Sequence, residues 1–407
     1  LVGSEMCIRD RYITLGLNVL LPWIFCKIKG FQYIYWPVDE KYLDIAVVFL
    51  ILILLITIVI VELSRYGGSK IEFSELDNSF LLGNGVTLLF WFSIILNLIN
   101  IVVTGGFRGI IVGAANSTII AYLQFFLDSR LLYFAVLLKA YKRQKIEEIC
   151  IYSFAYVAVS FMYSSRSGIF WMVFYNMVLL YALKLSKRFV QKIMLLMVVP
   201  IMLAPVLYML ATASRSDANL SIEGMINQIV GRVSYLEISA IEIEQAKTGD
   251  YVADVFNEKY GMENQAKQIV NMLVPGSVFQ DDVQPNQYWR AIFAGWTKEA
   301  AKEHYTSMYF VLPVYLYVKY GLMVAVILYA TIIYSLFRIT CKMKNNAFAL
   351  FVASYFFYSL FQFFDWVYHA QDIYAFLLTV ISIKVMEMLV GKYKIKIGAR
   401  KIFYDEI

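Results

Sequence analysis

Long runs of apolar residues constrain this chain more than any other feature of its sequence. Residues 42–62 read YLDIAVVFLILILLITIVIVE, with acidic residues only near the two ends of the run. Crossing the roughly 30 Å hydrocarbon core of a bilayer takes about 20 such residues in a helix. Comparable runs occupy 80–103, 117–138, 147–163, 168–184, 190–212, 309–337, 347–364 and 372–390, and a weaker one, interrupted by Pro22, occupies 12–26. The sequence therefore predicts an all-α fold, a polytopic transmembrane helical bundle of about 9–11 spans.

Composition supports a bilayer environment and excludes several classes of function. Hydrophobic residues make up 60% of the chain and charged residues 16%, with a mean hydropathy of +0.64, whereas an ordinary soluble domain carries about 25% charged residues. The net charge of +6 comes from short basic clusters between apolar runs, so we expect it to set topology and predict no nucleic-acid partner. The 4 cysteines form no CxxC motif and there are only 2 histidines, so we predict no metal site and no cofactor.

Four clusters of Lys and Arg orient the predicted spans. They lie at 139–145, 184–192, 338–344 and 392–401, and each consecutive pair is separated by two spans. All four clusters can therefore face the cytoplasm, which places the C-terminus on that side of the membrane. The loops 104–116, 164–167, 213–308 and 365–371 then face outward.

The same pattern divides the chain into five parts. Residues 1–11 (LVGSEMCIRDR) resemble a translated sequencing-adapter tail and are predicted to be an artefact. An N-terminal transmembrane bundle covers 12–212, a large outward loop covers 213–308, C-terminal transmembrane helices cover 309–390, and a basic cytoplasmic tail covers 391–407. Within the large loop, apolar residues at helical spacing predict an amphipathic helix over 222–246.

Arginines on the outward side are the first candidates for substrate binding. Arg166 lies in the tight turn SSRSG, and Arg215, Arg232 and Arg290 lie in the large loop. A planar guanidinium can bind a phosphate through two parallel hydrogen bonds, so several arginines on one face could hold a lipid-linked diphosphate. The alternative is that these side chains anchor the protein at lipid headgroups.

Candidates for acid–base chemistry are fewer. Glu237 lies near the apolar side of the predicted 222–246 helix, and His304 lies at the end of the large loop. Each could accept a proton, and each could equally be a structural residue paired within the fold.

Two further sets of charges stand out. His369 lies in FDWVYHAQD near Asp372; it could accept a proton near neutral pH, and the alternative is a structural histidine. Asp128 and Arg130 lie inside a predicted span two residues apart, so they are not expected to face each other on a continuous helix. They either pair with other helices, or the span consists of two half-elements.

Three features together resemble the Wzy-type O-antigen (oligosaccharide repeat-unit) polymerase family. They are the SRSG turn at 165–168 that opens the span SRSGIFWMVFYNMVLLYALK, a large outward loop late in the chain, and the following span TSMYFVLPVYLYVKYGLMVAVILY. The similarity covers about residues 80–390. The related O-antigen ligases share this plan, and their loop carries a functional histidine for which only His304 is available here.

The resemblance implies a metal-independent glycosyltransferase with one large periplasmic loop. Its substrate would be an undecaprenyl-diphosphate-linked oligosaccharide used for O-antigen, capsule or exopolysaccharide, and a chain-length regulator protein is an implied partner. Arg166, Arg215, Arg232 and Arg290 would contact the substrate, with Glu237 or His304 as the general base. The alternatives are an O-antigen ligase or other polyprenyl-linked sugar transferase, and a flippase for lipid-linked oligosaccharides.

Overall fold

Every secondary-structure element that the computed structural model describes is a helix. The model describes residues 19–28, 38–63, 76, 80–103, 123–162, 167–213, 236–248, 262–273, 311–342, 346–362 and 366–404. In chain order the elements are α2 (Leu21–Ile28), α3 (Glu40–Leu63), the 3₁₀ turn η2 (Phe80–Leu82), α5 (Asn84–Val103), α8 (Ser129–Lys142), α9 (Ile146–Met162), α10 (Ser167–Ala182), α11 (Lys187–Ala213), α13 (Leu236–Thr248), α15 (Met262–Leu273), α18 (Leu312–Tyr320), α19 (Leu322–Lys342), α20 (Ala347–Gln362) and α21 (Trp366–Tyr404).

Four of these helices are long and apolar enough to cross a membrane. Their spanning segments are Glu40–Ile60, Asn84–Val103, Leu322–Ile339 and His369–Val390. Shorter apolar helices cover Gly168–Ala182 and Ala347–Phe356. The prediction of an all-helical chain with membrane-spanning segments is thus confirmed for the described residues, while the larger count of about 9–11 spans stays a prediction.

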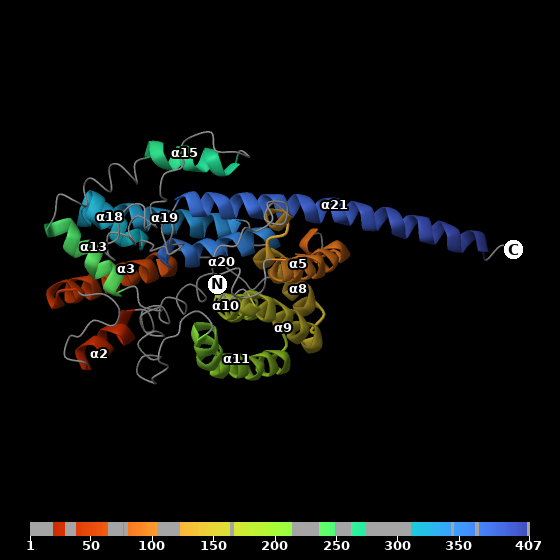
Figure 1. The fold of residues 1–407 in the computed structure, drawn as a ribbon, viewed down its shortest axis with the longest axis horizontal. Helices are drawn as coiled ribbons and strands as arrows, with labels where there is room; N and C mark the ends of the chain where they lie inside the picture. Colours follow the sequence, from red (N-terminus) through yellow and green to blue (C-terminus); the bar gives the residue numbers. More distant parts are fainter. Residues whose placement is uncertain are drawn as a thin grey trace.

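The helices pack into two apolar cores that α20 connects. The first core is formed mainly by α5, α8, α9, α10 and α21, and the second by α3, α13, α18 and α19. From α20, Phe351 and Tyr355 belong to the first core and Ala353 to the second. Figure 1 shows this arrangement, with α13, α15 and α18 gathered at one end and the C-terminal part of α21 projecting from the other.

Helix α8 lies at the centre of the first core and is too short to span a bilayer. Its residues from Leu131 to Tyr141 are all buried. Fourteen residues make a helix of about 21 Å, against a hydrocarbon core of about 30 Å. In its described part the predicted span 117–138 is not one continuous helix, because a turn at Phe126 and Leu127 precedes a helix that begins only at Ser129. This agrees with the alternative of two half-elements.

A second predicted span, 309–337, is also divided. Helix α18 ends at Tyr320 and α19 begins at Leu322. Between them Gly321 has φ 80° and ψ 169°, a backbone conformation that only glycine adopts readily. The tyrosine–glycine pair in the YVKYGLM stretch therefore marks a break between two helices.

We expect Gly321→Ala to destabilise the protein by roughly 1–3 kcal/mol, because alanine is strained in this backbone conformation. A Cβ at this position would have no atom within 4 Å, so the cost would come from the backbone alone. Thermal unfolding of the purified protein in detergent measures the effect. The control is Met323→Ala, two residues along and 74% exposed. Equal unfolding midpoints for the two variants would contradict the strain.

Candidate functional site

The first turn of α8 carries a pair of opposite charges. Asp128 caps the helix, and its Oδ1 accepts hydrogen bonds from the backbone N–H groups of Arg130 and Leu131, each at 3.0 Å. Its Oδ2 accepts from Arg130 Nε at 3.2 Å and Nη2 at 2.8 Å. Because Asp128 precedes the helix, its side chain can turn back onto Arg130. This geometry agrees with the alternative of two half-elements, since Asp128 precedes α8 and does not lie with Arg130 in one continuous helix.

Helices α20 and α21 complete this site. Asp372 of α21 accepts a hydrogen bond from Arg130 Nη2 at 2.5 Å through Oδ1, and its Oδ2 contacts the Tyr355 hydroxyl of α20. Thr379 Oγ1, two turns further along α21, accepts from the backbone N–H of Asp128 at 2.8 Å. We call Asp128, Arg130, Tyr355 and Asp372 the buried charge cluster, since their side chains are 0–17% exposed.

The start of α8, which carries the buried charge cluster, lies at the level of the middle of α5. Ser93, the tenth residue of α5, donates a hydrogen bond from Oγ to the Leu127 carbonyl at 3.2 Å. Further along α5, Asn97 Oδ1 accepts from Gln124 Nε2 at 3.1 Å, so α5 and α8 are antiparallel. Ionisable side chains at such a depth are expensive and are characteristic of functional sites.

Aromatic rings surround the guanidinium. Arg130 Cζ lies 5.3 Å from the centroid of the Tyr355 ring and 5.2 Å from that of Phe376, which places it within cation–π range. His369, 2% exposed, precedes Asp372 by one turn on the same face of α21. The sequence alone indicated a short turn here, but α21 begins at Trp366 and includes both residues.

A second polar contact fixes the opposite end of α8. Lys139, 7% exposed, donates from Nζ to Gly83 O at 2.8 Å, Asn84 Oδ1 at 2.9 Å and Thr87 Oγ1 at 3.2 Å. Glu387 of α21 accepts from the Gly85 backbone N–H beside it. The start of α5 is thus held by one cation from α8 and one carboxylate from α21, and α8 and α21 run parallel to each other.

Helix α13 presents two buried carboxyl groups away from the charge cluster. Glu237 and Glu242 are each 2% exposed. Among the described residues Glu242 Oε2 has no hydrogen-bond partner, nor has Ser239 Oγ one turn earlier. Burial raises the pKa of the Glu242 carboxyl well above its ordinary value.

Helix α13 is held against the first part of α3. Its Leu236, Ala240 and Ile243 belong to the same apolar core as the residues of α3 between Tyr42 and Leu54. Near its other end, Glu244 interacts electrostatically with Asp39 and Lys41 at the start of α3. The two buried carboxyls are therefore carried by a helix docked onto the beginning of a membrane-spanning segment.

Of the predicted site residues, Glu237 is the one that the structure describes. Glu237 lies in α13, buried as its apolar surroundings in the sequence suggested. Predictions for Arg166, Arg215, Arg232, Arg290 and His304 fall outside the described residues. Gly168 of the SRSG turn packs so closely on Ser160 that an added Cβ would lie 2.2 Å from the Ser160 Cβ, so this glycine has a packing role.

Sequence reasoning found half of the buried charge cluster. Asp128 and Arg130 were singled out as charges inside an apolar run, and that signal was sound. Asp372 and Tyr355 were missed as partners because no local pattern links α8 to helices more than 200 residues away. Glu242 carried a usable signal, since it shares the apolar stretch of α13 with Glu237.

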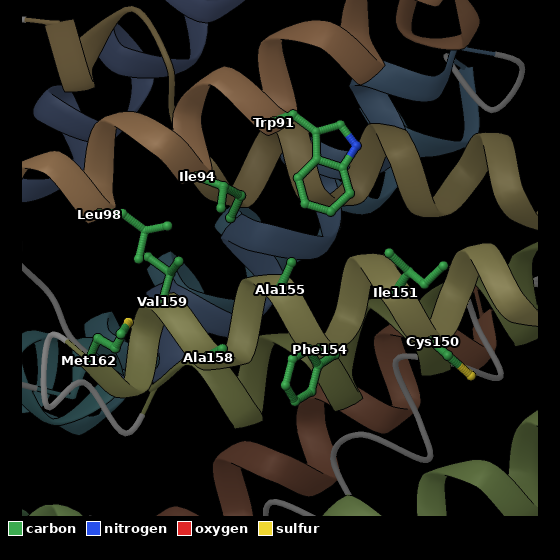
Figure 2. Close-up of a pocket in the computed structure, with 10 residues that line it drawn as sticks. All are labelled: Trp91, Ile94, Leu98, Cys150, Ile151, Phe154, Ala155, Ala158, Val159 and Met162. Carbon is green, nitrogen blue, oxygen red and sulfur yellow. The ribbon is translucent and has the colours of Figure 1, made fainter.

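An apolar groove runs between α5 and α9 (Figure 2). Its volume is about 610 Å³. Figure 2 shows Trp91, Ile94 and Leu98 of α5 on one side, and residues of α9 from Cys150 to Met162 on the other. The lining is almost wholly hydrocarbon, which suits an aliphatic chain.

Within the described residues, no group of three or more His, Cys, Asp or Glu side chains is arranged to hold a metal ion. Comparison with known proteins returns nothing: no family model, curated protein or solved structure matches the chain.

We expect Arg130→Gln to destabilise the protein by roughly 3–5 kcal/mol, because it leaves two buried carboxyl groups without their cation. The control is Arg143→Gln. Arg143 pairs with Glu148 at 3.6 Å with its side chain 46% exposed, and such surface pairs contribute about 1 kcal/mol or less. Chemical unfolding of the purified protein in mixed micelles compares the two variants. Similar losses in the free energy of unfolding for the two variants would show that the cluster stabilises the protein no more than a surface ion pair does.

Proposed function

We propose that this chain is a multi-pass glycosyltransferase of the bacterial inner membrane. It polymerises undecaprenyl-diphosphate-linked oligosaccharide repeat units at the periplasmic face, for O-antigen, capsule or exopolysaccharide, and its C-terminus lies in the cytoplasm. The observation that carries the proposal is the pair of buried carboxyls, Glu237 and Glu242, on a helix of the large loop docked against a membrane helix.

Charge distribution supports this orientation. The basic residues after Lys392 belong to the end of α21 that projects from the bundle, opposite α13 (Figure 1). If that end is cytoplasmic, then α13 and the first residues of α3 belong to the outer side. Acceptor sugars would reach the α13 carboxyls from the periplasm.

The chemistry of the reaction matches groups that the chain offers. Transfer to a sugar hydroxyl needs a general base, and a carboxyl whose pKa is raised towards neutrality is an effective one. Burial raises the pKa of Glu242 well above its ordinary value, and Glu237 is equally buried. His304 stays the other candidate base. The diphosphate leaving group needs positive charge, for which Arg166, Arg215, Arg232 and Arg290 remain the candidates.

The apolar groove between α5 and α9 adds support for a lipid-linked substrate. A polyprenyl chain is entirely hydrocarbon, and it could lie along α9 between Cys150 and Met162 with its diphosphate at one end of the groove. The bilayer's own acyl chains have the same chemistry, so the groove supports a lipid substrate without selecting undecaprenyl.

A second candidate function, a flippase for the same lipid-linked oligosaccharide, is favoured by α8. Broken helices that end near the middle of the membrane are typical of transporters. The start of α8 at the level of Ser93, with charged Asp128 and Arg130, has this character. An O-antigen ligase shares the reaction chemistry of the polymerase and differs in its acceptor.

Deleting the full-length gene in its host separates these functions when surface glycan is resolved on a gel. A polymerase deletion leaves single repeat units on the anchor and removes the ladder. A ligase deletion removes all surface glycan and leaves polymer on the lipid carrier, whereas a flippase deletion also prevents polymer from forming. An unchanged pattern would refute the glycan assignment altogether.

Complementation of the deletion strain tests the α13 carboxyls. We expect Glu242→Gln and Glu237→Gln each to shorten or abolish the ladder, since loss of a general base slows transfer roughly 100-fold or more. The control is Glu244→Gln on the same helix, where Glu244 is only partly buried. Membrane levels of each variant must be equal by immunoblot. A normal ladder from both test variants would exclude these carboxyls as the base.

The outward arginines need a separate comparison. We expect Arg166→Ala and Arg290→Ala to shorten the polymer, because each would remove a cation from the diphosphate site. Arg143→Ala, on the opposite side of the predicted topology, is the matched control. Unchanged polymer length in both test variants would remove these residues from the proposed site.

A further inference from the structure

The hydrogen bonds of the buried charge cluster distinguish its two carboxyl groups. Asp128 accepts four hydrogen bonds, two on each oxygen, and all four donors are N–H groups of Arg130 and Leu131. None of these groups can accept a hydrogen bond. A proton on Asp128 would therefore displace a donor, so this carboxyl is ionised.

Asp372 has different partners. Its Oδ1 accepts from Arg130 Nη2 at 2.5 Å, but its Oδ2 contacts the hydroxyl of Tyr355. A tyrosine hydroxyl can donate or accept. Oδ2 of Asp372 can therefore carry a proton and still make its hydrogen bond, with Tyr355 as the acceptor.

The balance of charge requires such a proton. Two carboxylates and one guanidinium in contact sum to one net negative charge, and an uncompensated buried charge costs several kcal/mol. Lys139, the other buried cation among the described residues, bonds Gly83, Asn84 and Thr87 near the opposite end of α8. Helix α5 has no ionisable side chain. The ionisable groups that neighbouring elements bring to the cluster are Tyr156 of α9, Tyr175 of α10 and His369 of α21, and α15, which packs against α21, carries the exposed Lys267.

We propose that Asp372 is an exchangeable proton-binding site, which holds a proton on Oδ2 against Tyr355. His369 lies one turn nearer the start of α21 and is buried beside Phe356, with 5.8 Å between the ring centroids. When the proton leaves, the Oδ2–H bond breaks, its electron pair stays on Asp372 and water accepts the proton, while Arg130 holds both carboxylates.

This inference goes beyond the proposed function and does not depend on it. An exchangeable proton near the middle of the bundle would serve a transporter by coupling its movement to that of a substrate. Its test uses purified protein and needs no glycan substrate.

Infrared spectroscopy detects the proton directly, because a protonated carboxyl has a carbonyl stretch that a carboxylate lacks. The reference protein is Glu242→Gln, since Glu242 is a second buried carboxyl. At neutral pH we expect Asp372→Asn in this background to lose one carboxylic-acid band. Tyr355→Phe should keep that band and move it to higher frequency, as its hydrogen bond is lost. An Asp372→Asn spectrum identical to the reference would overturn the proposal.

Stability against pH gives an independent result. The folded protein holds the proton to higher pH than the unfolded chain, so the stability it contributes is present in acid and lost as the pH rises. For one proton the unfolding equilibrium constant rises about tenfold per pH unit in that range. Asp372→Asn keeps the cluster neutral at every pH and should be the more stable protein in alkali.

Two variants locate the proton. His369→Gln should retain the Asp372 band, because the proton lies between Asp372 and Tyr355. Asp128→Asn should lose the band, since one carboxylate then balances Arg130. A His369→Gln protein that loses all pH dependence, beside an Asp372→Asn protein that keeps it, would place the proton on the histidine and contradict the assignment to Asp372.

Discussion

Arg130 is the residue on which the first core depends, because it connects three helices through ionic and aromatic contacts. It bonds Asp128 at the start of α8 and Asp372 on α21, and its guanidinium lies over the ring of Tyr355 on α20. A guanidinium has five N–H donors in a fixed plane, which suits it to contact two carboxyls at once. A helix as short and buried as α8 could not begin inside an apolar bundle unless its first turn were satisfied in this way.

The two ends of α8 are fixed by different chemistry. At its start the charges of the cluster compensate one another, whereas near its end Lys139 bonds neutral oxygens at the beginning of α5. Helix α21 bonds the start of α8 through Asp372, and further along its Glu387 accepts from Gly85 of α5, beside Lys139. This arrangement keeps α5, α8 and α21 in register, and it allows a proton to bind at one end without disturbing the other.

How much of the structure could be predicted from the sequence depends on how far apart in the sequence the interacting residues lie. Apolar runs are local, so α3 and α5 were predictable almost to their ends, whereas α21 (Trp366–Tyr404) extends well beyond the predicted span 372–390 at both ends. A break near Asp128 was one of two alternatives for the span 117–138, because its charges were conspicuous there. The break at Gly321 was not recognised, because a single glycine is a weak signal inside an apolar run. Asp128 and Arg130 were conspicuous as charged residues inside an apolar run. Their partner Asp372 lies on a helix that is distant in the sequence, and a contact between distant helices produces no local sequence pattern. Glu237 was identified from helical spacing, whereas Glu242 became notable only through its burial.

The most direct test of this account is a double-mutant cycle on Arg130→Gln and Asp372→Asn, with free energies of unfolding measured in mixed micelles. If the contact between Arg130 and Asp372 holds the bundle together, Asp372→Asn in the Arg130→Gln background removes a carboxyl group that has already lost its guanidinium partner. The double variant should then be clearly more stable than the sum of the single losses predicts, by more than about 0.5 kcal/mol. Additive losses would mean that the two side chains stabilise the protein independently, and the central role given to their contact would be wrong.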